Sequence, residues 1–160
     1  MTDIHEIMHN DNKSDLGNYR GSILMRFPKI FVLLAIGLFV FSLTQDCYYT
    51  NKYFQSGLDG WELLLIGWLG IFYGYFTWLA NPVILISWIF AVTRQFRIGL
   101  IVATGSMLIM LSFLFHKSIV INEAPTYSKI FGYGLGYWLW IVSAGFSIIA
   151  NLCRVMRGLN

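Results

Sequence analysis

Four long stretches of this sequence contain no charged residue, and they constrain the fold more than any other feature. They run over residues 30–43, 63–93, 98–116 and 130–153. A chain of 160 residues with only 12% charged side chains has too little polar surface to cover four such stretches in water. The hydrocarbon core of a bilayer is about 30 Å thick and accepts apolar helices of about 20 residues. The sequence therefore predicts an integral membrane protein.

The apolar stretches predict helices rather than strands. In lipid the backbone amides must be paired within the spanning structure, which leaves α-helices and closed β-barrels. Strands of a membrane barrel alternate polar and apolar residues, and FVLLAIGLFVF at residues 31–41 does not alternate. We therefore expect an all-α membrane bundle with four crossings, at about residues 29–45, 75–93, 98–116 and 132–153.

The second apolar stretch is too long for one straight crossing. Residues 61–93 would form a helix of about 50 Å at 1.5 Å per residue. Proline lacks an amide proton and clashes with the preceding turn, so we expect a helix kink at Pro82. The favoured interpretation is a crossing helix kinked at Pro82, with residues 61–73 as an interfacial or re-entrant half-helix. Two full crossings with a turn at LANP would leave only residues 83–93 for the second one.

The basic residues predict the orientation of the helices. Lys and Arg number four before residue 30, then one, two, two and two in the successive connections and the C-terminal tail. Because cytoplasmic segments carry the excess of these residues, we expect both termini in the cytoplasm. The connection at residues 117–129 fits least well, since it should lie outside and yet has two lysines. Residues 1–28 are polar and are expected to form a flexible cytoplasmic arm before the bundle of residues 29–160.

Three segments carry a resemblance to a known group of proteins. They are GWELLLIGWLG at residues 60–70, WLANP at residues 78–82 and NEAPTYSKIFGYGLGYWLW at residues 122–140. Together they resemble a family of small, uncharacterised bacterial inner-membrane proteins, over about residues 30–153. The resemblance implies a multi-pass helical protein of the bacterial cytoplasmic membrane, and it implies no activity.

Glycines at helical spacing are candidate contact residues. They are Gly67, Gly70 and Gly74 in one series and Gly132 and Gly136 in another. In lipid, helices associate through close contact of small residues rather than through exclusion from water. These glycines are expected either to pack helices within one bundle or to make contacts in a homo-oligomer or with a partner protein.

Three polar residues near the apolar stretches are candidate functional residues. Glu62 suits the N-terminal turn of a helix, and at a membrane edge it is also a candidate ionisable site. Asn81 is expected either to pair with carbonyls freed by the kink or to contact a substrate. His116 has no second ligand at metal-binding spacing, so it predicts no metal site.

The sequence contains no motif for catalysis or for binding a cofactor, a metal or a nucleotide. The basic residues sit at the ends of apolar stretches, so no nucleic-acid partner is expected. The favoured hypothesis is a non-enzymatic protein that acts through helix contacts with itself or with another membrane protein. Toxin immunity and membrane subunits of phage defence are analogous roles for proteins of this size. The alternatives are a small transporter, channel or accessory transport subunit, with Asn81 lining a path, and a membrane enzyme acting on lipid.

Overall fold

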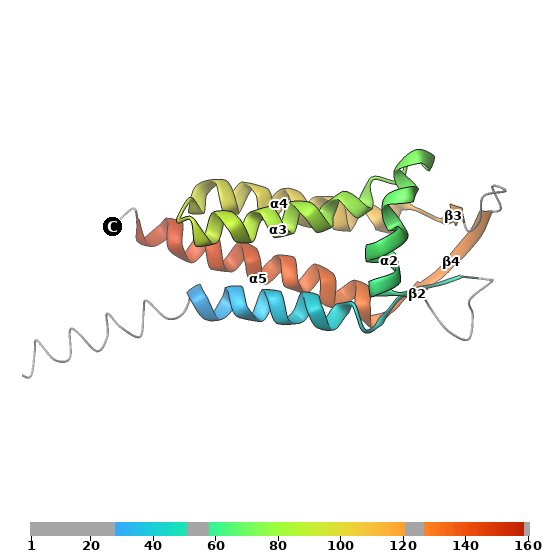
Figure 1. The fold of residues 1–160 in the computed structure, drawn as a ribbon, viewed down its shortest axis with the longest axis horizontal. Helices are drawn as coiled ribbons and strands as arrows, with labels where there is room; N and C mark the ends of the chain where they lie inside the picture. The colour runs from blue at the N-terminus through green and yellow to red at the C-terminus, as the bar shows by residue number, and fades with distance from the viewer. Residues whose placement is uncertain (1–27, 51–57, 121–126, 159–160) are drawn as a thin grey trace, which may run out of the picture.

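Four helices lie side by side along the long axis, and a small sheet covers one end of them (Figure 1). The computed structural model describes residues 28–50, 58–120 and 127–158. Apart from Pro28, the predicted cytoplasmic arm therefore lies outside the described residues. The four helices are the N-terminal helix Pro28–Ser42, α3 (Ala80–Val92), α4 (Phe96–Ser112) and α5 (Leu135–Arg157).

The sheet has four antiparallel strands in the order β2-β1-β4-β3. β1 (Asp46–Thr50) continues from the N-terminal helix, and β4 (Tyr127–Tyr133) leads into α5. Tyr48 of β1 pairs with Tyr133 of β4. The short strands β2 (Leu58–Asp59) and β3 (Ser118–Val120) form the two edges. The strand residues are rich in tyrosine and β-branched side chains, which favour a pleated, half-buried surface.

The prediction of an all-α bundle with four crossings is wrong. The sheet is one departure, and its strands lie in segments that the sequence analysis treated as connections. The other is helix length, since two helices in the described residues are long and apolar enough to cross a membrane. These are Phe96–Phe115, which is α4 extended by the 3₁₀ turn η3 (Phe113–Phe115), and α5. α3 has 13 residues and reaches only about 20 Å, well short of a hydrocarbon core.

The chain between β2 and α3 explains why α3 is short. It forms α2 (Gly60–Ile66), the 3₁₀ helix η1 (Gly67–Tyr73) and the 3₁₀ turn η2 (Thr77–Leu79). η1 ends at Gly74 with φ +83°, a left-handed conformation that favours glycine. The direction of the chain therefore changes at Gly74. Pro82 lies in the first turn of α3. The amides of a first turn have few partners within the helix, so the missing amide proton of proline costs little hydrogen bonding there.

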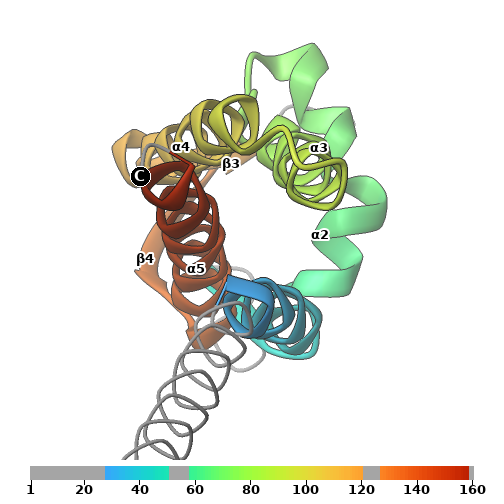
Figure 2. The same cartoon turned by 90° about the vertical axis from the view of Figure 1, so that its left-hand side faces the viewer.

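α2 runs across the side of the bundle. Viewed along the long axis, it spans the space between the N-terminal helix and α3 (Figure 2). Gly60 fixes its start, since its amide donates to the Gln45 carbonyl oxygen at 3.1 Å. The next amide, of Trp61, donates to the Leu43 carbonyl oxygen at 2.9 Å. α2 is thus anchored to the end of the N-terminal helix.

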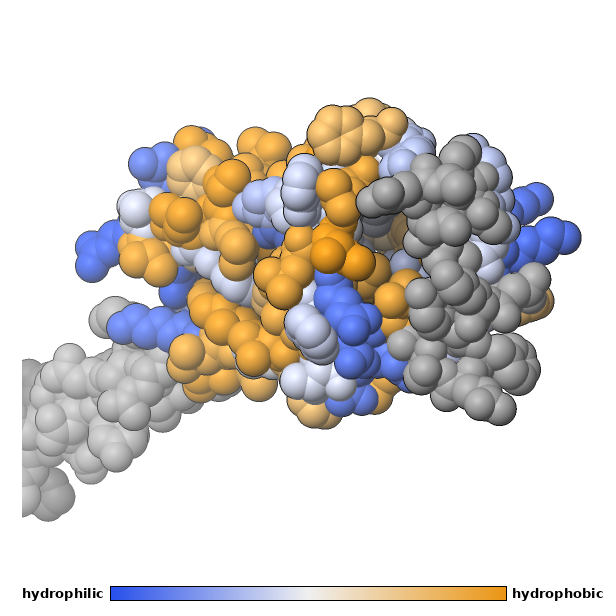
Figure 3. Space-filling view, turned by 45° about the vertical axis from the view of Figure 1, so that its right-hand side comes forward, coloured by the Kyte–Doolittle hydropathy of each residue, from blue (hydrophilic) through white to orange (hydrophobic). Residues whose placement is uncertain are grey.

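Small and polar side chains make up much of the interior of the bundle, and many large apolar ones face outward. A cluster of larger side chains is also buried, namely Phe39, Ile84, Met110, Tyr137 and Ile141. Val92 is 77% exposed and Ile101 is 72% exposed. Apolar side chains cover much of the helical part in Figure 3. Soluble proteins show the opposite distribution, whereas helices packed in lipid meet through small residues. The buried small and polar residues of the four helices are Ala35, Ser42, Ala80, Ser87, Ala91, Ala103, Ser106, Ser143, Ala144, Ser147, Ala150 and Asn151.

Polar side chains link the helices to one another at several levels. Ser106 of α4 donates to the Ala80 carbonyl oxygen at 3.0 Å, where α3 begins. Trp88 of α3 donates from its indole nitrogen to the Ser147 hydroxyl of α5 at 2.8 Å. At the end of the bundle away from the sheet, the Arg154 guanidinium of α5 donates to the Ala91 carbonyl oxygen of α3 at 2.6 Å. These contacts fix α3, α4 and α5 in register.

Two glycines of α5 give a direct test of this packing. A Cβ atom on Gly136 would lie 2.6 Å from the Gln45 carbonyl oxygen and 2.9 Å from that of Ser42. A Cβ atom on Gly145 would meet nothing within 4 Å. We expect Gly136→Ala to lower the free energy of unfolding by about 1–3 kcal/mol because backbone would have to move. Gly145→Ala should be neutral or stabilise by up to about 1 kcal/mol through helix propensity.

The measurement is thermal unfolding of the purified variants in detergent, followed by the loss of helical circular dichroism. A Gly136→Ala protein that melts at the same temperature as Gly145→Ala would contradict the close approach of α5 to the end of the N-terminal helix.

Candidate functional site

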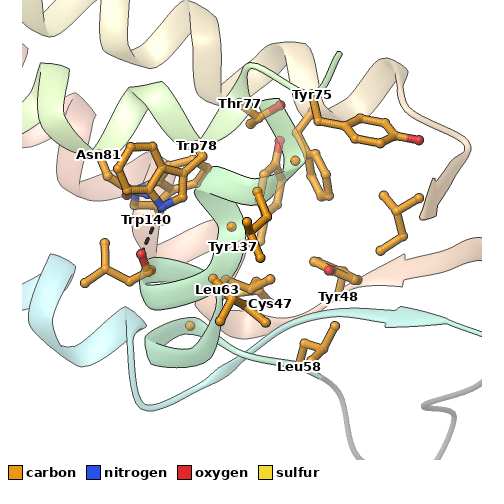
Figure 4. A pocket seen from close by; sticks show the side chains of 18 of the residues that line it. Cys47, Tyr48, Leu58, Leu63, Tyr75, Thr77, Trp78, Asn81, Tyr137 and Trp140 are labelled. Atoms are coloured by element: carbon orange, nitrogen blue, oxygen red, sulfur yellow. Dashed lines mark hydrogen bonds between the residues drawn. The ribbon is translucent and has the colours of Figure 1, made fainter. Parts of the chain in front are cut away.

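A cavity of about 410 Å³ lies where the helices meet the sheet. Its lining comes from α2, η1, η2, the start of α3, α5 and the strands β1 and β3. Figure 4 shows Leu63, Trp78 and Tyr137 directed toward the same space from α2, η2 and α5. Its volume lies within the range of ligand pockets, about 300–1,000 Å³.

α2 and η1 form one wall of this cavity, and Trp78 holds that wall in place. The Trp78 indole nitrogen donates to the Leu64 carbonyl oxygen of α2 at 2.9 Å, the bond drawn in Figure 4. A Cβ atom on Gly67 would lie 2.7 Å from Cδ1 of Trp78, so the indole packs directly on the η1 backbone. A glycine at position 67 is what allows this contact.

Aromatic rings build the wall next to the sheet. The ring centroids of Tyr48 and Phe113 are 5.5 Å apart, and those of Phe113 and Tyr137 are 5.8 Å apart. Tyr133 continues the cluster, with its centroid 4.8 Å from that of Tyr137. Such pairs stabilise beyond the area that they bury. The cluster therefore gives the cavity a rigid apolar surface.

Several polar groups of the lining have no hydrogen-bond partner. Within the described part of the chain, these are the hydroxyls of Thr50 and Thr77 and the indole nitrogen of Trp140. Thr50 is 0% exposed and Thr77 is 8% exposed. Buried polar groups in native proteins are nearly always hydrogen-bonded, so each exception requires an explanation. Asn81 adds a side-chain amide to the same lining.

The structure brings three of the sequence-predicted residues to the cavity. Gly67, Gly70 and Asn81 all line it. Gly67 contacts Trp78, and a Cβ atom on Gly70 would lie 3.3 Å from Cβ of Tyr75. The close contacts of these glycines are therefore made within the chain.

The other predicted residues lie apart from the cavity lining. Gly74 forms the turn after η1, Gly132 lies in β4, and Gly136 packs on the end of the N-terminal helix. Glu62 is in the first turn of α2. The His116 ring lies beside that of Tyr75, with centroids 5.2 Å apart, and its Nδ1 is 3.2 Å from the Ser112 carbonyl oxygen.

Sequence reasoning did not single out Thr77 or Trp140. One signal was present, because Thr77 and Asn81 are four residues apart in an apolar run and so share a helix face. Trp140 gave no such signal, since a tryptophan in an apolar helix is compatible with lipid, core or cavity. Its role follows only from its unpartnered nitrogen.

In the ranges that the structure describes, no three His, Cys, Asp or Glu side chains are grouped to hold a metal ion. No protein-family model, curated protein sequence or solved structure matches this chain. The resemblance to small bacterial inner-membrane proteins therefore stays a prediction.

Cys47 lines the cavity and provides a reporter of its interior. Burial, followed by the nearby carboxylates of Asp46 and Asp59, raises the pKa of its thiol to about 12. The thiolate is the reactive form. A rise from 9.0 to about 12 lowers the thiolate fraction at pH 7 by roughly a thousandfold.

We therefore expect Cys47 to react slowly with a maleimide at pH 7 and faster as the pH rises. In a Cys153→Ser background Cys47 is the single thiol, and the rate is followed by mass spectrometry. The same protein unfolded in denaturant serves as the reference. Equal rates for the folded and unfolded protein at pH 7 would show that the thiol is not buried and that its pKa is not raised.

Proposed function

We propose that this chain is an integral membrane protein in which α4 and α5 cross the bilayer. In the most apolar 18-residue stretches of the two spans, only 22% and 33% of the residues are buried within the protein. The core helix of a soluble protein would be mostly buried. The outward apolar side chains and the many small and polar residues buried between the helices support the same proposal.

The basic residues support one orientation. Arg94 and Arg97 flank the start of α4, and Arg154 and Arg157 lie in the last turn of α5. The α3–α4 turn and the end of α5 lie at the same end of the molecule in Figure 1, opposite the sheet. Under the positive-inside rule this end is cytoplasmic, and the sheet and cavity face outward. The membrane that the sequence resemblance implies is the bacterial cytoplasmic membrane.

The function that the geometry supports best is binding of a lipophilic molecule taken from the bilayer, without catalysis. One observation carries this proposal, namely an apolar cavity whose lining holds unpartnered polar groups. The lining contains no Asp, Glu, His, Lys or Arg among the described residues. General acid–base catalysis depends most often on such side chains. The raised pKa of Cys47 also disfavours a thiol nucleophile.

The hypothesis of helix contacts with a partner stays a prediction with less support. Gly67, Gly70 and Gly136, three of the five glycines behind it, lie close to residues of the same chain. Their close contacts are already made within the chain, so these glycines are not free to pack against a helix of another protein. Asn81 lines the cavity, so a transport role would use the same site that we propose for binding.

The orientation is tested with single cysteines in a background without Cys47 and Cys153. Tyr127→Cys places a thiol on β4, and Gln95→Cys places one in the α3–α4 turn, both at exposed positions. In intact cells a membrane-impermeant maleimide should label the first and spare the second until the membrane is permeabilised. Labelling of both, or of the second alone, would overturn the proposed orientation.

The binding function is tested with two leucines of α2. Leu63 lines the cavity, whereas Leu65 is 62% exposed and outside the lining. A long-chain alcohol with a diazirine in its alkyl chain is added to the protein in phosphatidylcholine nanodiscs and irradiated. Peptide mass spectrometry then locates the label.

We expect labelling of the cavity walls that falls at least fivefold in Leu63→Trp, because the indole fills the cavity. Leu65→Trp should retain the labelling. Labelling confined to the outer faces of α4 and α5, or unchanged in Leu63→Trp, would contradict the proposed function.

A further inference from the structure

Two sets of polar groups in the cavity lining differ in their hydrogen bonds. One set donates to backbone carbonyl oxygens within the protein and is therefore occupied. The occupied donors are Ser42, Tyr75, Trp78 and Tyr137. The other set consists of Thr50, Thr77 and Trp140, which have no partner among the described residues. The atoms of this second set are buried in the cavity wall with almost no exposed surface, so a ligand oxygen would reach them only where neighbouring side chains move slightly.

The unpartnered groups specify hydrogen-bonding chemistry. The indole nitrogen of Trp140 is a donor and never an acceptor. A molecule that pairs with it must present an acceptor atom. The Thr77 hydroxyl donates and accepts, as does the amide of Asn81, so both tolerate either a carbonyl or a hydroxyl oxygen. Figure 4 draws Asn81 and Trp140 at the same end of the cavity, with Thr77 on the same helical run as Asn81.

The absence of charged residues from the described lining favours a neutral ligand. None of the described lining residues is charged, and the two carboxylates near Cys47, Asp46 and Asp59, lie outside the lining. An ion moved from water into such a site would lose its hydration and gain no counter-charge. A carboxylate, phosphate or quaternary ammonium group is therefore disfavoured.

The remaining walls of the cavity favour a ligand that has a hydrocarbon part. They are formed by leucine, isoleucine, valine and aromatic side chains. Leu69 and Tyr73 of η1 line the cavity and are about half exposed, so they continue its apolar surface to the outside of the molecule. In the proposed orientation this surface lies at the outer edge of the bilayer. A chain of a membrane lipid can reach the cavity along it.

We infer that the cavity takes a neutral amphiphile of the bilayer, whose carbonyl or hydroxyl oxygen accepts a hydrogen bond from Trp140. Its hydrocarbon part lies against the apolar walls, and Thr77 and Asn81 pair with the same oxygen or a second one. This inference rests on the proposed binding function and adds the chemistry of the head group. Water alone on Trp140 and Thr77, with a plain hydrocarbon in the cavity, is the competing outcome.

The experiment uses one diazirine-bearing alkyl chain with five different ends. The ends are a methyl ketone, a primary alcohol, a plain methyl group, a carboxylate and a trimethylammonium group. Each probe is photolabelled into the protein in nanodiscs, and cavity labelling is measured against probe concentration. We expect the ketone and the alcohol to bind about tenfold more tightly than the plain hydrocarbon, the gain typical of one hydrogen bond. The two charged probes should bind more weakly than the hydrocarbon.

Trp140→Phe removes the donor and keeps an aromatic ring, and Thr77→Val removes the hydroxyl at nearly constant volume. Each should reduce the advantage of the ketone over the hydrocarbon, with Trp140→Phe abolishing most of it. Trp138→Phe is the matched control, since Trp138 is 47% exposed on α5 and does not line the cavity. Neither Trp140→Phe nor Thr77→Val breaks a bond of the empty protein. Thermal stability without probe should therefore be unchanged or higher, which separates a ligand contact from a structural one.

The two proposals fail in different ways. If no probe labels the cavity walls, the binding function itself is wrong. If the plain hydrocarbon labels them as tightly as the ketone, or if Trp140→Phe leaves the ketone advantage intact, binding stands and the head-group inference is wrong. Tight binding of either charged probe would also overturn the inference.

Discussion

The close approach of α5 to the end of the N-terminal helix is the contact on which the rest of the structure depends. Gly136 lies against the carbonyl oxygens of Ser42 and Gln45, and the Gly134 amide donates to the Cys47 carbonyl oxygen at 2.9 Å. Two segments almost 90 residues apart in the sequence are thereby joined where the helices end. β1 and β4 leave this junction already side by side, so their pairing follows from it. The sheet in turn supplies the wall of the cavity that carries Tyr48 and Ile119.

The same junction fixes the wall on the opposite side. The backbone at Leu43 and Gln45 accepts the first amides of α2, and the other end of this wall is held by the Trp78 indole. Trp78 belongs to η2, which continues into α3, and α3 is held to α4 by the bond from Ser106 to Ala80. This wall is therefore tied to the rest of the protein at both ends, by backbone hydrogen bonds at Leu43 and Gln45 and by the side chains of Trp78 and Ser106. This explains how a space of about 410 Å³ persists among close-packed helices.

The sequence predicted the parts of the fold that depend on composition. Uncharged runs located the helices, and α4 and α5 begin and end within a few residues of two expected crossings. It did not predict the sheet, because β1 and β4 pair across most of the chain and neither strand alternates clearly. In the second apolar run it placed the boundary between half-helix and crossing helix at Gly74, where the chain turns, and it expected a kink at Pro82, which lies in the first turn of α3. Proline restricts the helix interior but suits the first turn, and the sequence alone did not distinguish these positions.

Among the polar groups that line the cavity, the sequence singled out Asn81 alone. Asn81 stood out as a polar residue in an apolar run, whereas Trp140 looked like any other aromatic residue of a membrane helix. What distinguishes Trp140 is the absence of a partner for its nitrogen, while the neighbouring Trp78 and Tyr137 both donate to backbone carbonyls. Backbone carbonyls thus pair with the polar atoms of Trp78 and Tyr137, whereas the Trp140 nitrogen and the Thr77 hydroxyl have no partner among the described residues. An empty site with fixed, unpartnered donors is less stable than one with none, and that difference is regained when an acceptor enters. In the proposed site, selectivity for an oxygen atom would follow from these unpartnered groups, because a plain hydrocarbon in the cavity would leave the Trp140 nitrogen and the Thr77 hydroxyl unpaired.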